Sequence, residues 1–129
     1  MAISVNLDTI ILYVRDVERL KLFYLHIFKL DIAEEHGTQW VLLKTGNFHV
    51  GLHQASEKYL ARGNTGQWKS NAKIVFKVTE DIHLLRIRLI SQGVAMREVK
   101  TFDDYPYWLC DGEDPEGNVF QLKQQKLIQ

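Results

Sequence analysis

The sequence predicts a single α+β domain made of two tandem β-α-β-β-β modules. A chain of 129 residues, 46% hydrophobic and 25% charged, is long enough for one hydrophobic core and too short for two large domains. A strand, a helix and three further strands are predicted in the first half, and the same order returns in the second half. At an offset of 64 residues the halves pair similar residues, such as Ile10 with Ile74 and Val14 with Val78. The duplication therefore rests on element order and not on sequence identity.

The first module, about residues 7–53, opens with a strand at residues 9–14 that is rich in β-branched and large apolar residues. Asp16 can then cap a helix that runs to about Lys29. Its apolar residues recur at helical spacing, and they are Val17, Leu20, Tyr24, Ile27 and Phe28. Strands are predicted at residues 30–35, 38–44 and 48–53, joined by turns at His36-Gly37 and Gly46-Asn47.

A polar segment at about residues 54–71, rich in turn-forming residues, is predicted to link the two modules. The second module, about residues 72–125, begins with a strand at residues 73–78. Glu80 or Asp81 can cap the helix that follows, and Gly93 suits the position after its end. The apolar face of this helix is predicted to be Ile82, Leu85, Leu89 and Ile90. Strands are predicted at about residues 94–101, 107–110 and 119–124, with a type I turn at residues 114–117.

Charge and composition argue against several classes of protein. Lys+Arg and Asp+Glu are both 16, so the formal net charge is zero, and the sequence lacks the clustered basic residues typical of nucleic-acid binding. No apolar run reaches the roughly 18 residues of a membrane span, and the start has no charged-then-apolar secretion pattern. The single cysteine, Cys110, allows no internal disulfide and suits a reducing compartment. We expect a cytoplasmic protein with no nucleic-acid or membrane partner.

Three stretches carry a resemblance to a known superfamily. They are Val-Arg-Asp-Val at 14–17 with the later Phe23-Tyr24, then Gln-Gly-Val at 92–94, and Asp-Pro-Glu-Gly-Asn at 114–118 before a final strand. In this order, over about residues 7–125, they resemble the vicinal oxygen chelate superfamily, which includes glyoxalase I, bleomycin-resistance proteins and extradiol dioxygenases. The resemblance implies a cupped mixed sheet with helices on the outside, a small-molecule ligand in the cup, and a homodimer. Lys29 departs from the glycine that the superfamily usually has there, so we expect the first helix to end differently.

The resemblance also maps the superfamily's metal-ligand positions onto Thr9, Gly51, Lys73 and Gln121. Sites for Zn²⁺, Fe²⁺ or Mn²⁺ need imidazole or carboxylate groups, usually three of them, and none of these four residues supplies one. A two-residue shift in register would bring in only His49 or His53. Because four residues along a strand separate these two by about 13 Å, they cannot share an ion. We therefore expect no metal and no other cofactor.

Alternation along the strands predicts which side chains face the cup. The Gly46-Asn47 hairpin pairs Leu42 with Gly51 and Trp40 with His53, and the second hairpin pairs Asp111 with Gln121. The residues expected to contact a ligand are Tyr13, Trp40, His49, His53, Lys73, Tyr107, Asp111 and Gln121. The other interpretations are aromatic side chains that only pack, histidines at the rim, a solvated lysine, and an aspartate paired with a nearby lysine. Cys110 is predicted to point at a helix as an inert core thiol.

The predicted function is metal-independent binding of a small aromatic molecule, uncharged or anionic, as in a resistance or sequestration protein. The mixed lining, with lysines and histidines, argues against a cation such as bleomycin. One alternative is a metal-dependent lyase or dioxygenase of the same superfamily, which would need the missing ligands. Another is a metal-free enzyme that uses His53, His49 or Tyr13 in acid–base chemistry, although no catalytic triad or dyad can be identified in the sequence. A small regulatory or interaction domain is a third alternative.

Overall fold

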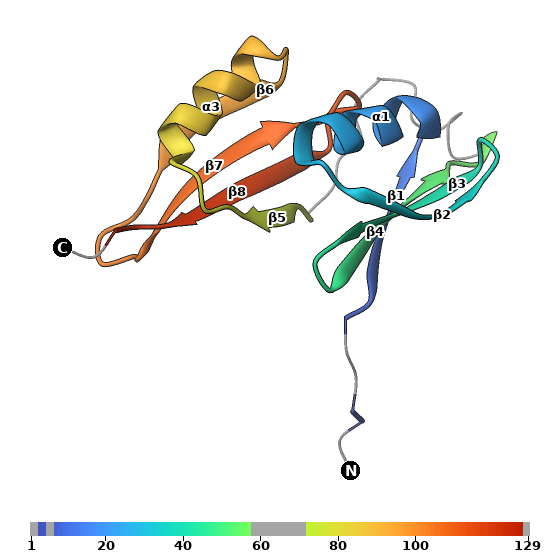
Figure 1. The fold of residues 1–129 in the computed structure, drawn as a ribbon, viewed down its shortest axis with the longest axis horizontal. Coiled ribbons are helices and arrows are strands. Elements are labelled where there is room, and N and C mark those ends of the chain that lie inside the picture. Colours follow the sequence, from blue (N-terminus) through green and yellow to red (C-terminus); the bar gives the residue numbers. More distant parts are fainter. Residues whose placement is uncertain (1–2, 5–6, 58–71, 128–129) are drawn as a thin grey trace. The chain divides into compact units, whose positions relative to one another are not determined.

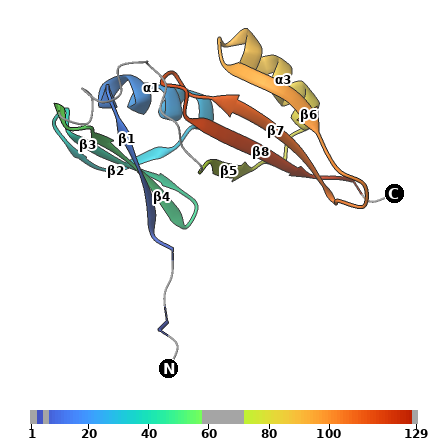
Figure 2. The same ribbon diagram turned by 180° about the vertical axis from the view of Figure 1, so that it is seen from behind.

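The computed structural model describes residues 3–4, 7–57 and 72–127, and the chain forms two compact units, residues 1–66 and 67–129 (Figures 1 and 2). Each unit contains a four-stranded mixed sheet and a helix in the order β-α-β-β-β. The α+β class and the two tandem modules are confirmed, whereas the joining of both sheets into one cup stays a prediction. Most of the predicted linker at about residues 54–71 lies outside the described residues. No helix in the described ranges is long and apolar enough to cross a membrane.

The first unit has the strand order β1-β4-β3-β2, with β1 parallel to β4 and the other pairs antiparallel. Its elements are β1 (Thr9–Val14), α1 (Val17–Phe28), β2 (Asp31–His36), β3 (Trp40–Thr45) and β4 (Phe48–Gln54). The predicted pairs Trp40 with His53 and Leu42 with Gly51 are both confirmed. Figure 1 shows α1 running across one face of this sheet. The opposite face therefore lies away from the helix.

Helix α1 begins and ends at the predicted residues. The side chain of Asp16 accepts a hydrogen bond from the backbone nitrogen of Arg19 at 3.1 Å, and this cap satisfies one free N–H of the first turn. Lys29 ends the helix in the left-handed conformation, with φ 52° and ψ 43°. The expectation of a different ending was therefore wrong, because this lysine adopts the backbone shape that glycine usually supplies.

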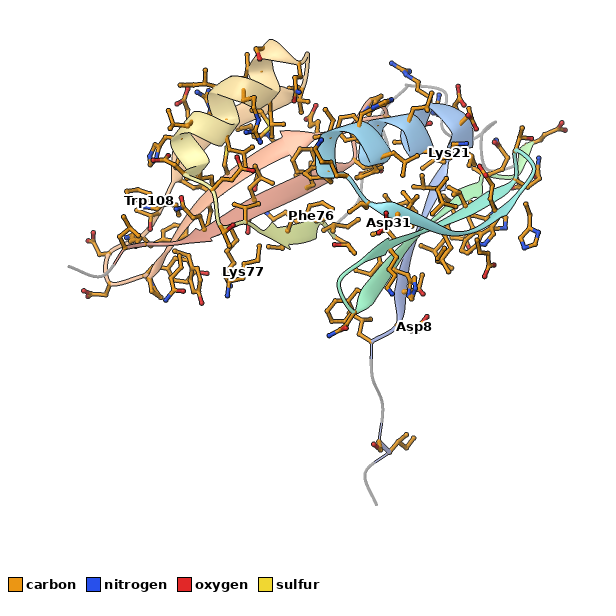
Figure 3. All side chains as sticks on the ribbon, in the orientation of Figure 1. Asp8, Lys21, Asp31, Phe76, Lys77 and Trp108 are labelled. Carbon is orange, nitrogen blue, oxygen red and sulfur yellow. The ribbon has the colours of Figure 1, made fainter. Side chains whose placement is uncertain are left out.

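The edge of the first sheet differs from the prediction in its turn. His36 belongs to β2 and pairs with Trp40, so the loop spans residues 37–39 and not His36-Gly37. Gly37 has φ 54°, which explains why a glycine is placed there. Lys21 of α1 reaches this edge strand, with its Nζ 2.7 Å from the Oε2 of Glu35 (Figure 3). The ion pair holds the helix against β2.

The second unit has the strand order β5-β8-β7-β6, with β5 parallel to β8. Its elements are β5 (Ile74–Lys77), α3 (Ile82–Ser91), β6 (Ala95–Lys100), β7 (Tyr107–Glu113) and β8 (Val119–Gln125). The side chain of Asp81 caps α3 by accepting from the backbone nitrogens of His83 and Leu84. Ile90 was placed wrongly on the buried face of this helix, since 44% of it is exposed, whereas Ile82, Leu85 and Leu89 are buried. The predicted pairing of Asp111 with Gln121 is confirmed.

The turn between β7 and β8 closes on a buried aspartate. The backbone oxygen of Asp114 accepts from the nitrogen of Gly117 at 2.9 Å, the bond expected of the predicted turn. Its side-chain Oδ1 accepts from the backbone nitrogens of Glu116 and Asn118. On the neighbouring strand Cys110 is fully buried, and burial raises the pKa of its thiol. The hydrogen bonds of Asp114 therefore stabilise the turn that joins β7 to β8.

Candidate functional site

Three ring side chains of the first unit gather on the face of the sheet away from α1. We call Tyr13, Trp40 and His53 the aromatic cluster. His53 on β4 lies between its register partners Tyr13 on β1 and Trp40 on β3. The ring centroids of Tyr13 and His53 are 5.3 Å apart, and those of Trp40 and His53 are 5.9 Å apart. Tyr13 is 55% exposed, so the cluster offers ring surface to a ligand.

Gly51 makes room for the indole of this cluster. A Cβ atom at Gly51 would lie 2.4 Å from Cη2 and 2.8 Å from Cζ3 of Trp40. The indole therefore covers the bare backbone of β4, and its Nε1 donates to Oε1 of Glu34 at 2.9 Å. From the sequence, Gly51 was predicted to pair with Leu42 and to lack a metal ligand, and its packing against Trp40 was not predicted. A glycine inside a strand, diagonal to a large aromatic residue, is the signal that could have indicated this role.

A pocket of about 870 Å³ lies beside the aromatic cluster in the first unit. Its lining combines Tyr13 and His53 with Gln39, Gln54, Ala55, Ser56 and Glu57. The last five residues were not predicted to line a site, because Gln39 was placed within a strand and residues 54–57 at the start of the linker. Strand β4 in fact continues through Gln54, and the nitrogen of Ala55 donates to the oxygen of Val14 at 2.8 Å. A concave site with aromatic walls and a few polar groups suits a small molecule.

The two predicted histidines occupy opposite ends of β4. The Nδ1 of His53 is 2.8 Å from the backbone oxygen of Gln54. Because a carbonyl can only accept, Nδ1 carries the proton, and Nε2 of the neutral ring is left as an acceptor. The Nδ1 of His49 is 3.4 Å from the backbone oxygen of Asp8, which Figure 3 labels before β1. The structure thus places His53 in the aromatic cluster and His49 outside it.

The second unit brings together the predicted polar residues Lys73, Asp111 and Gln121. The Nζ of Lys73 lies 3.1 Å from Oδ2 of Asp111, and Nε2 of Gln121 donates to Oδ1 at 2.9 Å. Asp111 is only 5% exposed. Burial acts to raise the pKa of Asp111, but hydrogen bonds from Gln121 and Lys73 outweigh it and hold the pKa below its ordinary value. Asp111 is therefore a buried, negatively charged carboxylate that attracts positively charged side chains.

Two further cations near Asp111 come from β6, and sequence analysis missed both. Nη1 of Arg97 lies 3.6 Å and Nζ of Lys100 3.9 Å from Oδ2 of Asp111. A register shift between Met96 and Val99 interrupts the alternation of side chains along β6. The face on which Arg97 and Lys100 lie could therefore not be predicted from the sequence.

Tyr107 lies on the same strand as Asp111. The Nζ of Lys123 is 4.1 Å from the centroid of the Tyr107 ring, close enough for a cation–π contact. Lys123 was not among the residues expected to contact a ligand. The residues predicted to contact a ligand lie partly in the first unit and partly in the second, and each unit is described by itself. Their contact with one common ligand therefore stays a prediction.

No protein-family model matches the sequence, and no curated protein matches it. The integron cassette protein HFX_CASS4, from the mobile metagenome of the Halifax Harbour sewage outfall, is similar in structure. It is 19% identical, with a TM-score of 0.74 over 92% of this chain and 97% of that one. Lactoylglutathione lyase from Agrobacterium tumefaciens is 15% identical, with a TM-score of 0.67 over 92% of both chains. TnmS3, an antibiotic binding protein from Streptomyces sp. CB03234, is 23% identical, with a TM-score of 0.70 over 98% of this chain and 99% of that one.

The chain has the vicinal oxygen chelate fold. The fold resemblance read from the sequence is thereby confirmed. Because one fold supports many chemistries, the function of this domain must be argued from its side chains.

The side chains at Thr9, Gly51, Lys73 and Gln121, the four positions predicted from the resemblance as metal-ligand positions, do not suit a divalent ion. Gly51 has no side chain and lies under the indole of Trp40. Lys73 and Gln121 both donate to Asp111, and the hydroxyl of Thr9 donates to Asp8. Within residues 3–4, 7–57 and 72–127, no three or more His, Cys, Asp or Glu side chains group closely enough to hold a metal ion.

Proposed function

We propose that this protein binds a small aromatic molecule, uncharged or anionic, without a metal ion. The observation that carries the proposal is the aromatic cluster, in which Tyr13 and His53 line a pocket of about 870 Å³ and Trp40 packs against His53. Aromatic side chains stack against a flat ligand and bury large apolar areas. The shared fold of TnmS3, an antibiotic binding protein, gives further support to a binding role.

The charge of the second unit supports the second part of the proposal. Lys73, Arg97 and Lys100 all lie within 4 Å of the buried carboxylate of Asp111. A surface with this surplus of cations repels a cationic ligand and accepts an uncharged or anionic one. Metal independence is supported by the donor set, because Thr9, Gly51, Lys73 and Gln121 offer neither imidazole nor carboxylate.

Acid–base catalysis without a metal is the second candidate function, and His53 favours it. Its Nδ1 proton is held by the backbone oxygen of Gln54, which leaves Nε2 of the neutral ring free to accept a proton. The Tyr13 ring lies 5.3 Å away and could supply a hydroxyl. Conversion of a bound compound, followed by chromatography and abolished in His53→Gln, would favour this candidate over simple binding.

A homodimer and a cytoplasmic location belong to the same proposal. Exposed Leu22 on α1 supports an apolar contact with a second copy, since 46% of this side chain is exposed. Light scattering of the purified protein tests the assembly: a mass of two chains supports the homodimer, and a mass of one chain contradicts it.

A thermal-shift screen over aromatic antibiotics and aromatic acids tests the binding proposal. A ligand should raise the melting temperature of the natural protein and have no effect on Trp40→Ala or His53→Ala. His26→Ala is the matched control, because His26 is an exposed histidine of the same unit that lies on α1, outside the aromatic cluster. A ligand whose effect survives both cluster variants would overturn the proposal.

A further inference from the structure

We propose that the sheet of the second unit carries an anion-binding site, built by Lys77 and Lys123, that takes the carboxylate or phosphate group of a small molecule. The inference rests on the proposed function in that it assigns a charge to the ligand. The site itself is defined within the second unit alone. Neither lysine was among the residues expected to contact a ligand.

The two lysines are direct neighbours in the sheet. Lys77 on β5 pairs with Lys123 on β8 in the parallel register, so both side chains leave the same face. Figure 3 shows Lys77 pointing from β5 to the side opposite Phe76, away from α3. Like charges placed side by side on a strand pair destabilise it. A bound anion between the two ammonium groups would reverse that repulsion.

On the sheet face that carries this pair, positively charged side chains outnumber carboxylates. Side chains that leave the second sheet away from α3 include more cations than carboxylates. The cations are Lys73, Lys77, Arg97, Lys100 and Lys123, and the carboxylates on the same strands and face are Asp111 and Glu113.

Both carboxylates of this face already form hydrogen bonds or ion pairs with other side chains. Asp111 accepts from Lys73 and Gln121, and Glu113 lies 3.1 Å from Nη2 of Arg97. The other acids of the unit lie at α3, on its side of the sheet, or in the turns: Glu80, Asp81, Glu98, Asp103, Asp104, Asp114 and Glu116. Among the described residues of the second unit, no carboxylate forms an ion pair with Lys77 or Lys123.

Neighbouring side chains suit an organic body on the anion. The ammonium group of Lys123 lies 4.1 Å from the centroid of the Tyr107 ring on β7, so this ring is an aromatic surface beside the charge. Val75, two residues before Lys77 on the same face, is 48% exposed and gives an apolar surface beside the charges. An aromatic carboxylate or a phosphate ester matches this combination of two cations and an apolar neighbour.

Nuclear magnetic resonance titration of the full chain at constant ionic strength tests the site with three probes: inorganic phosphate, benzoate and uncharged benzyl alcohol. Phosphate or benzoate should shift the amide signals of β5 and β8. The dissociation constant should rise by about tenfold or more in the Lys77→Gln/Lys123→Gln double variant, since charge-assisted contacts are lost. Lys126→Gln is the matched control, because Lys126 belongs to the same unit but lies over Trp108. Without an anion, the double variant should melt at a higher temperature than the natural protein.

The outcomes separate the anion site from the proposed function. Binding of phosphate alone or benzoate alone supports the site and identifies which group it takes. Equal anion affinity in the double variant and the natural protein overturns the site, as does benzyl alcohol that shifts the β5 and β8 signals as strongly as benzoate. Phosphate should bind Trp40→Ala unchanged. If the anion does not bind but an aromatic ligand still does, the anion site is overturned and the proposed function is kept. If the aromatic ligand does not bind but the anion still does, the proposed function is overturned and the anion site is kept.

Discussion

Replacing Gly51 with alanine is the sharpest perturbation of the aromatic cluster, because it displaces an indole without removing it. The backbone at Gly51 tolerates alanine, since this residue is not among the glycines with positive φ. The added methyl group would instead meet Trp40, at 2.4 Å from Cη2 and 2.8 Å from Cζ3. Ordinary carbon–carbon contacts are about 3.5–4.0 Å, so the ring must move by about 1 Å or more.

The free energy of unfolding should fall by about 1–2 kcal/mol in Gly51→Ala. Overpacking costs about 1–3 kcal/mol in general, and the lower part of this range applies because Trp40 is half-buried and can rotate outward. Rotation would break the hydrogen bond from its Nε1 to Glu34. Affinity for an aromatic ligand found in the screen should fall as it does in Trp40→Ala.

Urea denaturation of a double-mutant cycle measures this coupling. In a Trp40→Ala background, Gly51→Ala should change the free energy of unfolding by less than about 0.5 kcal/mol, because the ring that it would strike is gone. If the change costs the same in both backgrounds, the indole does not depend on the bare backbone at Gly51, and the reasoning is refuted.

Three further changes test local parts of the structure. Lys29→Gly should raise the free energy of unfolding by about 1 kcal/mol, since a glycine adopts the left-handed conformation without strain; an unchanged urea midpoint would contradict this. Asp114→Ala should lower it by about 1–3 kcal/mol, because the donors of Glu116 and Asn118 lose a buried acceptor; a loss below that range would show the turn holds without its aspartate. Asp111 has a pKa lowered by folding, so its charge stabilises the protein above the unfolded pKa of about 3.9. That advantage over Asp111→Asn should shrink as the pH falls through the folded pKa, and a difference constant from pH 7 to pH 2 would contradict the assignment.

The element order and the registers of the β3–β4 and β7–β8 hairpins could be predicted from the sequence. Alternation with a period of two and a Gly-Asn turn fix which residues oppose each other, and Trp40 duly lies opposite His53. The same counting paired Gln121 with Asp111 and placed Lys73 on the same face, and the structure brings all three together. These predictions depend only on local geometry, which is why they succeeded.

Features that depend on irregular backbone or on the filling of space could not be predicted. The shift in β6 hid the facing of Arg97, since alternation fails at a bulge. The polar composition of residues 54–57 indicated a linker, although these residues line a pocket. Gly51 was interpreted as a position without a metal-binding side chain. Its role instead is to leave space for Trp40, which lies two residues from its register partner on the facing strand.

The most direct test of metal-independent aromatic binding is calorimetric titration of an aromatic ligand from the screen into chelator-treated protein. Parallel titrations would use protein supplied with Mn²⁺ or Zn²⁺, and the Trp40→Ala variant. We expect the same dissociation constant with and without metal, and its loss in Trp40→Ala. Binding that requires the metal, or that is unchanged in Trp40→Ala, would contradict the account.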